Sequence, residues 1–329
     1  MTRGTAITLA LLLTIGSASP HAYLKLGAVV NGRVIAATWK QQPIGYFISE
    51  RPGNGVTPMD LLAATQRATA TWSGVPSANV RFAFQSMTSA PAEGIDGKTV
   101  LGFIDRPDLD RVLGATSFMI DTATGEIAEA DIFFNSRFAF SVAPNGQADR
   151  VDLESVVLHE LGHLLGLGHS AIGETERNSS GSRQVIGSGS VMFPIAMMAG
   201  ATAGRALQPD DIAGISDLYP AGQILDAGGI VGRVTKNGQG VMGAHVVAFN
   251  PETGILVGNF TLDTDGAFVI ARLPSGPYIL RVEPLDDAEP DSFFPGAIDT
   301  DFRVTYAPRM IVAPSGGSSP TIEIQVRPK

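Results

Sequence analysis

The stretch that decides the fold lies near the middle of the chain and reads His159-Glu160-Leu161-Gly162-His163-Leu164-Leu165-Gly166-Leu167-Gly168-His169. Residues four apart share one face of a helix, so the imidazoles of His159 and His163 can reach one ion. A catalytic zinc takes three protein ligands and keeps a fourth position open for water. Gly166 permits the positive φ that ends a helix and turns the chain back, which would bring His169 to the same ion. The stretch predicts a metal site with three histidine ligands.

Glu160 is the acidic residue of this stretch. It is rotated from His159 by one helical step, so its carboxylate should lie beside the ion and not on it. Zinc lowers the pKa of bound water toward ~7, and a neighbouring carboxylate can take the proton when that water attacks a carbonyl. We therefore expect Glu160 to act as general base. The alternative is an ordinary helix whose histidines have no metal, and the matched positions beyond a bare H-E-x-x-H argue against it.

Composition narrows the possible classes of function. The 329 residues are 44% hydrophobic and 17% charged, which suffices for a core, and the length favours two domains. The net charge is -9 and there is no lysine or arginine run, so we do not expect nucleic acid as a partner. Cysteine is absent, which excludes disulfides and thiolate ligands. Any metal must be held by carboxylates and by the five histidines, of which the remaining two are His21 and His245.

The N-terminal residues 1–22 have the order of parts of a secretory signal peptide. A charged start is followed by an apolar run over residues 5–15 and then by small residues. This run is too short to span a membrane, and the other interpretation is a buried N-terminal helix. We expect cleavage after Ala18 or Ala22 and a secreted, extracellular protein without a membrane span.

Residue patterning divides the remaining chain into a mixed part, 23–222, and a strand-only part, 223–329. In the first part, periodicity predicts strands at 39–48, 80–84, 99–104, 116–120 and 130–134 and helices at 58–72, 151–165 and 209–218. Residues 173–189 are rich in Ser, Gly and Asn and should form an exposed loop. A Gly-rich stretch at 220–229 marks the boundary, and the short strands beyond it predict a small all-β sandwich.

The first part resembles the metzincin metallopeptidases, and within them the matrixin-like branch. Four features carry the resemblance: Ser170 directly after the third histidine, a segment similar to the Met-turn at 190–194, a closing helix at 207–219 and a strand at 130–135. The resemblance implies an α+β zinc peptidase domain with a mixed twisted sheet and an active-site helix. It also implies that Met192 forms a hydrophobic floor beneath the zinc.

The same resemblance implies a zinc endopeptidase that acts on protein or peptide substrates. By analogy, residues 112–120 would be the edge strand that pairs with an extended substrate, and an internal strand fits the sequence equally well. The histidines of a second, structural zinc are missing, so we expect one zinc. Calcium is a further candidate through four acidic residues, although such groups are usually just solvated: Asp105, Asp108, Asp110 and Asp121.

The second part is similar to carboxypeptidase regulatory-like domains, which have a transthyretin-like β-sandwich. The resemblance rests on residues 229–234, 243–248, 263–268 and 273–278. It implies no activity, and His245 should be a strand residue and not a ligand. This domain could bind a surface or matrix ligand. Because every residue with a chemical role lies at or before Met192, a chain that ends near residue 222 should keep the zinc.

Three functions remain open at this stage. The first is a secreted zinc endopeptidase with an appended sandwich that tethers, stabilises or positions it. The second is a surface adhesion or matrix-binding protein whose zinc site is structural or decayed, and the intact Glu160 argues against it. The third is a zinc hydrolase that acts on non-peptide amides, which would use the same chemistry.

Overall fold

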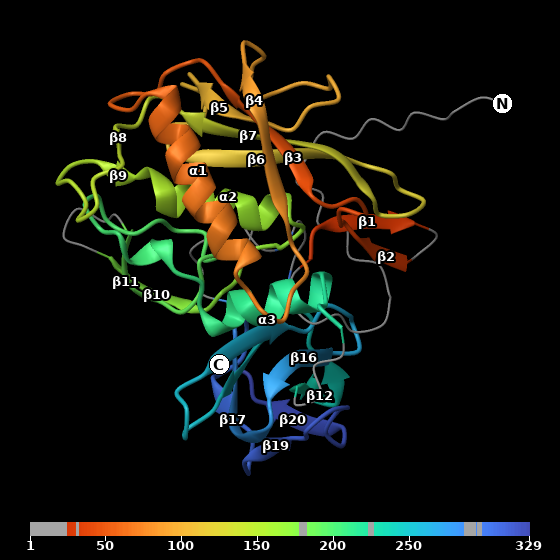
Figure 1. Ribbon diagram of the computed structural model, residues 1–329. Coiled ribbons are helices and arrows are strands. Elements are labelled where there is room, and N and C mark those ends of the chain that lie inside the picture. The colour runs from red at the N-terminus through yellow and green to blue at the C-terminus, as the bar shows by residue number, and fades with distance from the viewer. Residues whose placement is uncertain (1–24, 31–32, 178–182, 223–226, 286–293, 295–297) are drawn as a thin grey trace.

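A computed structural model describes residues 25–30, 33–177, 183–222, 227–285, 294 and 298–329 (Figure 1). The expected signal peptide at residues 1–22 therefore lies outside the described residues. In the part that the structure describes, no helix is both long and apolar enough to cross a membrane.

The first part of the chain is built on a five-stranded sheet with the order β4-β3-β5-β7-β6. The first four of these strands run parallel, and β6 pairs antiparallel with β7 at one edge. The strands are β3 (Ile44–Ser49), β4 (Phe82–Thr88), β5 (Val100–Ile104), β6 (Gly114–Ile120) and β7 (Ile127–Asn135). The position of β6 confirms the expectation of an edge strand near residues 112–120.

Two helices, α1 (Pro58–Ser73) and α2 (Leu153–Leu164), pack against this sheet and against each other (Figure 1). A capping box starts α1, in which Asp60 N donates to Thr57 Oγ1 and Thr57 N donates to Asp60 Oδ2. The buried Trp72 near the end of α1 donates from Nε1 to Leu158 O of α2 at 3.0 Å. This bond and the shared apolar core fix α2 relative to the sheet.

Three short pairs of strands complete this part. Two of them are β1 (Gly27–Val30) with β2 (Arg33–Ala36), and β8 (Phe140–Ser141) with β9 (Val151–Asp152). The third consists of β10 (Gly173–Arg177) and β11 (Arg183–Ser188), which pair antiparallel. The expectation of an exposed loop at 173–189 was therefore wrong, because paired strands occupy most of the described part of this segment. Backbone pairing overrides the weak strand preference of Ser and Gly in this segment, and Val185 provides a buried anchor.

Beyond a 3₁₀ turn, η1 (Ala203–Arg205), helix α3 (Pro209–Leu218) lies between the two parts of the chain (Figure 1). Ile215 belongs to the first apolar core and Ala213 to the second. The neighbouring Ile212 is 37% exposed. The helix thus contributes to both cores.

Two packed sheets form the second part. One contains β12 (Ala227–Lys236), β13 (Gln239–Gly240), β16 (Ala267–Pro274) and β20 (Ile322–Val326). The other contains β14 (His245–Phe249), β15 (Leu256–Phe260), β17 (Gly276–Glu283), β18 (Thr305–Tyr306) and β19 (Ile311–Ala313). Phe268, Tyr278 and Phe302 are fully buried between them, which gives this part a core of its own.

Gly162 of α2 faces the buried side chains of Met192 and Trp72 in the first core. A Cβ on this residue would overlap with Met192 Sδ and approach Trp72 Cζ2 to 3.1 Å. Met192 and Trp72 are both buried, so neither side chain can move toward solvent. The absence of a side chain at this position lets Met192 lie directly against α2.

We expect Gly162→Ala to destabilise the fold by about 1–3 kcal/mol, the usual cost of overpacking, despite the higher helix propensity of alanine. Denaturant unfolding in the presence of a metal chelator would measure the difference without any contribution from bound metal. Gly187→Ala is the control, because a Cβ there meets no atom within 4 Å. Equal stability of the two variants would contradict the packing described for Met192.

Candidate metal centre

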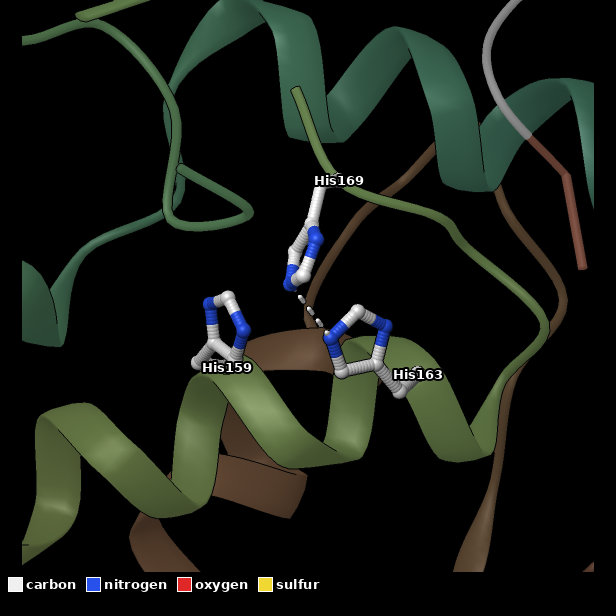
Figure 2. Close-up of side chains that lie close together, drawn as sticks. All are labelled: His159, His163 and His169. Carbon is white, nitrogen blue, oxygen red and sulfur yellow. Dashed lines mark hydrogen bonds between the residues drawn. The ribbon is translucent and has the colours of Figure 1, made fainter. Parts of the chain in front are cut away.

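Three histidine side chains converge above α2 (Figure 2). His159 and His163 project from the helix, and His169 approaches from the segment that follows it. One ligand atom from each lies within 4.8 Å of the others, and the Nε2 atoms of His163 and His169 are 3.2 Å apart. Among the described residues, no other group of three or more histidine or carboxylate side chains meets in this way.

The turn after α2 brings His169 back over the helix. Gly166 has φ +96°, its N–H donates to His163 O at 2.7 Å, and Leu167 N donates to Gly162 O at 3.0 Å. These two bonds form a Schellman motif, which closes a helix with a left-handed residue. A Cβ at Gly166 would also overlap with Ala37 O. The expected role of Gly166 is confirmed.

Backbone carbonyls fix the orientation of two of the rings. His159 Nδ1 donates to Val191 O at 2.7 Å, and His163 Nδ1 donates to Leu167 O at 2.8 Å. A carbonyl can only accept, so each ring carries its proton on Nδ1 and presents the Nε2 lone pair to the centre of the group. Metal-binding histidines are commonly oriented by such a bond behind the ring.

Burial favours the uncharged form of these imidazoles. It lowers the pKa of His159 to about 4, helped by the neighbouring His169 and opposed by the bond to Val191 O. The pKa of His163 is lowered for the same main reason. Both rings are therefore neutral near pH 7, and a metal ligand must be neutral imidazole.

Glu160 is buried beside the histidines and is not a member of the group of ligand atoms. Its Oε2 accepts a hydrogen bond from Thr116 Oγ1 of β6 at 2.7 Å. Burial raises the pKa of Glu160 to about 7, and the bond from Thr116 partly opposes this shift. The carboxyl group can therefore both take and release a proton near neutral pH. Thr116 was not predicted, because its contact joins residues 44 positions apart.

Met192 is buried against Gly162 of α2, and its turn is held by Asp211 of α3. One carboxylate of Asp211 accepts from Ser190 Oγ at 2.6 Å, from Val191 N at 2.9 Å and from Met192 N at 3.2 Å. Val191 O is the carbonyl behind His159, so Asp211 also fixes the orientation of that ring. Acidic residues are favoured at the start of any helix, so the local pattern around Asp211 indicates only that role.

The calcium candidates do not come together. Asp105, Asp108, Asp110 and Asp121 form no group of three or more possible ligand atoms. Asp108 instead pairs with Arg106, and Asp121 accepts from Ala123 N in a turn. Asp108 and Asp121 thus interact with nearby residues on separate stretches of the chain. The geometry does not support the candidate calcium site.

His245 lies in the β-sandwich and outside the group of three. It is buried on β14, where its Nδ1 lies 3.0 Å from Glu283 Oε1 and its ring packs against Phe260. It is a strand residue, as expected. His21 lies outside the described residues.

Comparison with known proteins finds local matches to two plant metalloendoproteinases and to one solved structure. Metalloendoproteinase 5-MMP of Arabidopsis thaliana is 40% identical over 79 residues, which is 24% of this chain and 17% of that protein. Metalloendoproteinase 2-MMP of the same plant is 42% identical over 74 residues, or 22% of this chain and 14% of the relative. The chain thus matches less than a fifth of the length of either relative. The Bacillus anthracis TIE protein matches 31% of this chain and 17% of its own at 13% identity, with a TM-score of 0.23.

The family model for matrixin extends further than these local matches. It covers residues 38–220, more than half of the chain. This segment contains the five-stranded sheet, the three histidines and the turn at Met192. The family is one of zinc-dependent metalloendopeptidases, and it implies a mixed α+β fold and a zinc cofactor. The chain belongs to the matrixin family of metallopeptidases.

Proposed function

We propose that this protein is a secreted zinc endopeptidase in which His159, His163 and His169 hold one zinc ion and Glu160 is the general base. The observation that carries the proposal is the convergence of three imidazoles beside a buried glutamate. Secretion rests on the signal-like pattern of residues 1–22 alone. The role of Met192 as a floor is supported by its burial against Gly162.

Each residue of the site has a distinct role in the proposed hydrolysis. A bound zinc would polarise the scissile carbonyl and acidify a water molecule. Glu160 takes the proton from that water and passes it to the leaving amine, and its raised pKa suits both steps. Thr116 holds the carboxylate in one orientation through its hydroxyl. The carbonyls of Val191 and Leu167 keep two of the imidazoles aimed at the ion.

Strand β6 gives the substrate a place to bind. Asn135 N donates to Leu113 O at 2.8 Å, so these two residues form a hydrogen-bonded pair between β7 and the start of β6. Along an antiparallel ladder such pairs alternate with pairs that have no hydrogen bond between them. The backbone groups of Gly114, Thr116 and Phe118 therefore point away from β7. An extended peptide could add to this edge as a further strand, directly beside Glu160. Such pairing depends little on side chains, which suits an endopeptidase.

The sandwich resembles carboxypeptidase regulatory-like domains, and its two-sheet architecture supports that assignment. A surface or matrix ligand of this domain is part of the alternative adhesion function. Screening the purified protein against denatured proteins, a peptide library and small amides would separate an endopeptidase, an adhesion protein and a hydrolase of other amides. Cleavage of internal peptide bonds supports the endopeptidase.

The three histidines predict one zinc per chain, because they leave a single ligand set of this kind in the described residues. Metal analysis of a dialysed sample should give one equivalent, and a strong chelator should remove it together with the peptidase activity. Added zinc should restore both. A sample without zinc, or with two tightly held ions, would contradict this assignment.

Glu160→Gln should keep the zinc and lower peptidase turnover by ~10²- to 10⁴-fold, the usual contribution of a general base. Glutamine preserves the shape and can still accept the bond from Thr116, so the fold and the metal content should not change. Steady-state kinetics and metal analysis on the same preparation would check both. Near-normal turnover would remove Glu160 from the mechanism.

Thr116→Val should lower kcat by roughly 10- to 100-fold, because a hydrogen bond to a charged group contributes about 1.5–3 kcal/mol. Valine keeps the β-branched shape and the backbone groups of β6, so zinc content and KM should stay close to their original values. Thr116→Ser keeps the hydroxyl and should retain most of the activity. If valine and serine behave alike, the hydroxyl does not position Glu160.

A further inference from the structure

The segment that carries the third histidine is packed against the C-terminal sandwich. Two positions beyond His169, Ala171 contacts the small apolar cluster of Phe260, Leu285 and Phe294. The next residue, the buried Ile172, lies against Gly258 of β15, so close that a Cβ on this glycine would be 3.1 Å from Ile172 Cδ1. The chain directly after the third histidine therefore has the sandwich as its neighbour.

Asp210 of α3 joins the two parts through one carboxylate. Its Oδ2 accepts from Ser170 Oγ at 2.7 Å, and its Oδ1 accepts from Gly258 N at 2.9 Å. The side chain is buried, and a buried carboxylate is costly unless hydrogen bonds satisfy it. Ser170 follows His169 directly, and its hydroxyl also accepts from Ile172 N at 3.2 Å. The sandwich thus supplies one of the bonds that hold Asp210, and Asp210 holds the residue next to the ligand.

The interface leaves little space around these contacts. A cavity of about 20 Å³ is lined by His169, Met192 and Asp210 on one side and by His245 and Phe260 on the other. This volume accommodates about one water molecule. At the far end of α3, Asp217 pairs with Lys25 at 2.5 Å and lies 3.8 Å from Arg272 of β16. The sandwich therefore contacts α3 near both of its ends.

We propose that the C-terminal sandwich is a positioning part of the metal centre, which acts on His169 through Gly258, Asp210 and Ser170. The proposal rests on the zinc site of the proposed function. It also changes the expectation from sequence: a chain that ends near residue 222 would lose the Gly258 bond to Asp210 and the packing of Ala171 and Ile172. The sandwich would then be required for tight zinc binding although it supplies no ligand.

The first test uses the full-length protein and disturbs the contact between Gly258 and Asp210 by a substitution in the sandwich. In Gly258→Ala the new Cβ would lie 2.6 Å from His245 Nε2 and 3.1 Å from Ile172, which pushes β15 away from Asp210. Gly229→Ala is the matched control on β12, where a Cβ meets nothing closer than 3.4 Å. Zinc affinity is measured by chelator competition, and thermal unfolding of the metal-free proteins checks the fold.

We expect Gly258→Ala to weaken zinc binding by roughly 10- to 100-fold, the range seen when a residue behind a metal ligand is changed. Gly229→Ala should match the original protein. The absorption spectrum of the cobalt-substituted protein should also change in Gly258→Ala alone, because a shifted His169 alters the ligand field. Unchanged affinity and spectrum in a folded Gly258→Ala protein would overturn the proposal.

The second test acts on Asp210 and remains informative if Gly258→Ala does not fold. Asp210→Ala removes the bonds from Gly258 N and Ser170 Oγ and should reproduce the loss of affinity and the cobalt spectrum. Asp210→Asn should recover most of both, because its carbonyl can accept from Gly258 N and its amide can donate to Ser170 Oγ. Adding Gly258→Ala to Asp210→Ala should lower the zinc affinity little further, since both substitutions act through one contact. Independent, additive losses would contradict the linkage.

These outcomes are distinct from a failure of the proposed function. If the unchanged protein binds no zinc, the function itself is wrong. If it binds zinc and cleaves peptides while every Asp210 and Gly258 variant does the same, only the role of the sandwich is wrong.

Discussion

Three imidazoles can face one point only if the rings cannot rotate, because a rotated ring turns its lone pair away from that point. In this protein a backbone carbonyl behind His159 and another behind His163 prevent that rotation. One carbonyl, Leu167 O, belongs to the turn that Gly166 makes possible, and the other, Val191 O, belongs to the turn that Asp211 holds. The two turns between α2 and α3 therefore hold the carbonyl oxygens of Leu167 and Val191 in place behind the rings.

The residues that sequence alone identified share a local physical signal. Residues four apart on one helix must lie on one face, and a glycine at the end of that helix allows only a few continuations. The histidines and Gly166 follow from these two constraints without any long-range information. The strand at 112–120 was predicted, but its edge position was not distinguished from an internal one. Strand periodicity is the same whether a strand has one neighbour or two.

The residues that sequence missed act across long separations in the chain. Thr116 meets Glu160 44 positions away, and Gly258 meets Asp210 48 positions away. Asp210 and Asp211 are adjacent at the start of α3, where acidic residues are favoured in any protein, so their pattern shows only the local role. Their side chains then reach different partners, one toward the sandwich and one toward the turn at Met192. The periodicity of helices and strands does not indicate such contacts, because they form only when separate elements pack against each other.

The edge position of β6 has a consequence for what the proposed enzyme can cut. A sixth strand must arrive fully extended, with its own backbone donors and acceptors unoccupied over several residues. Residues inside a folded helix or sheet do not meet that condition, because their backbone groups are already paired. Only chain termini, exposed loops and unfolded proteins can lie along β6. The shape of one sheet would therefore protect intact neighbours of this enzyme and direct it to damaged or unstructured ones, before any side chain is recognised.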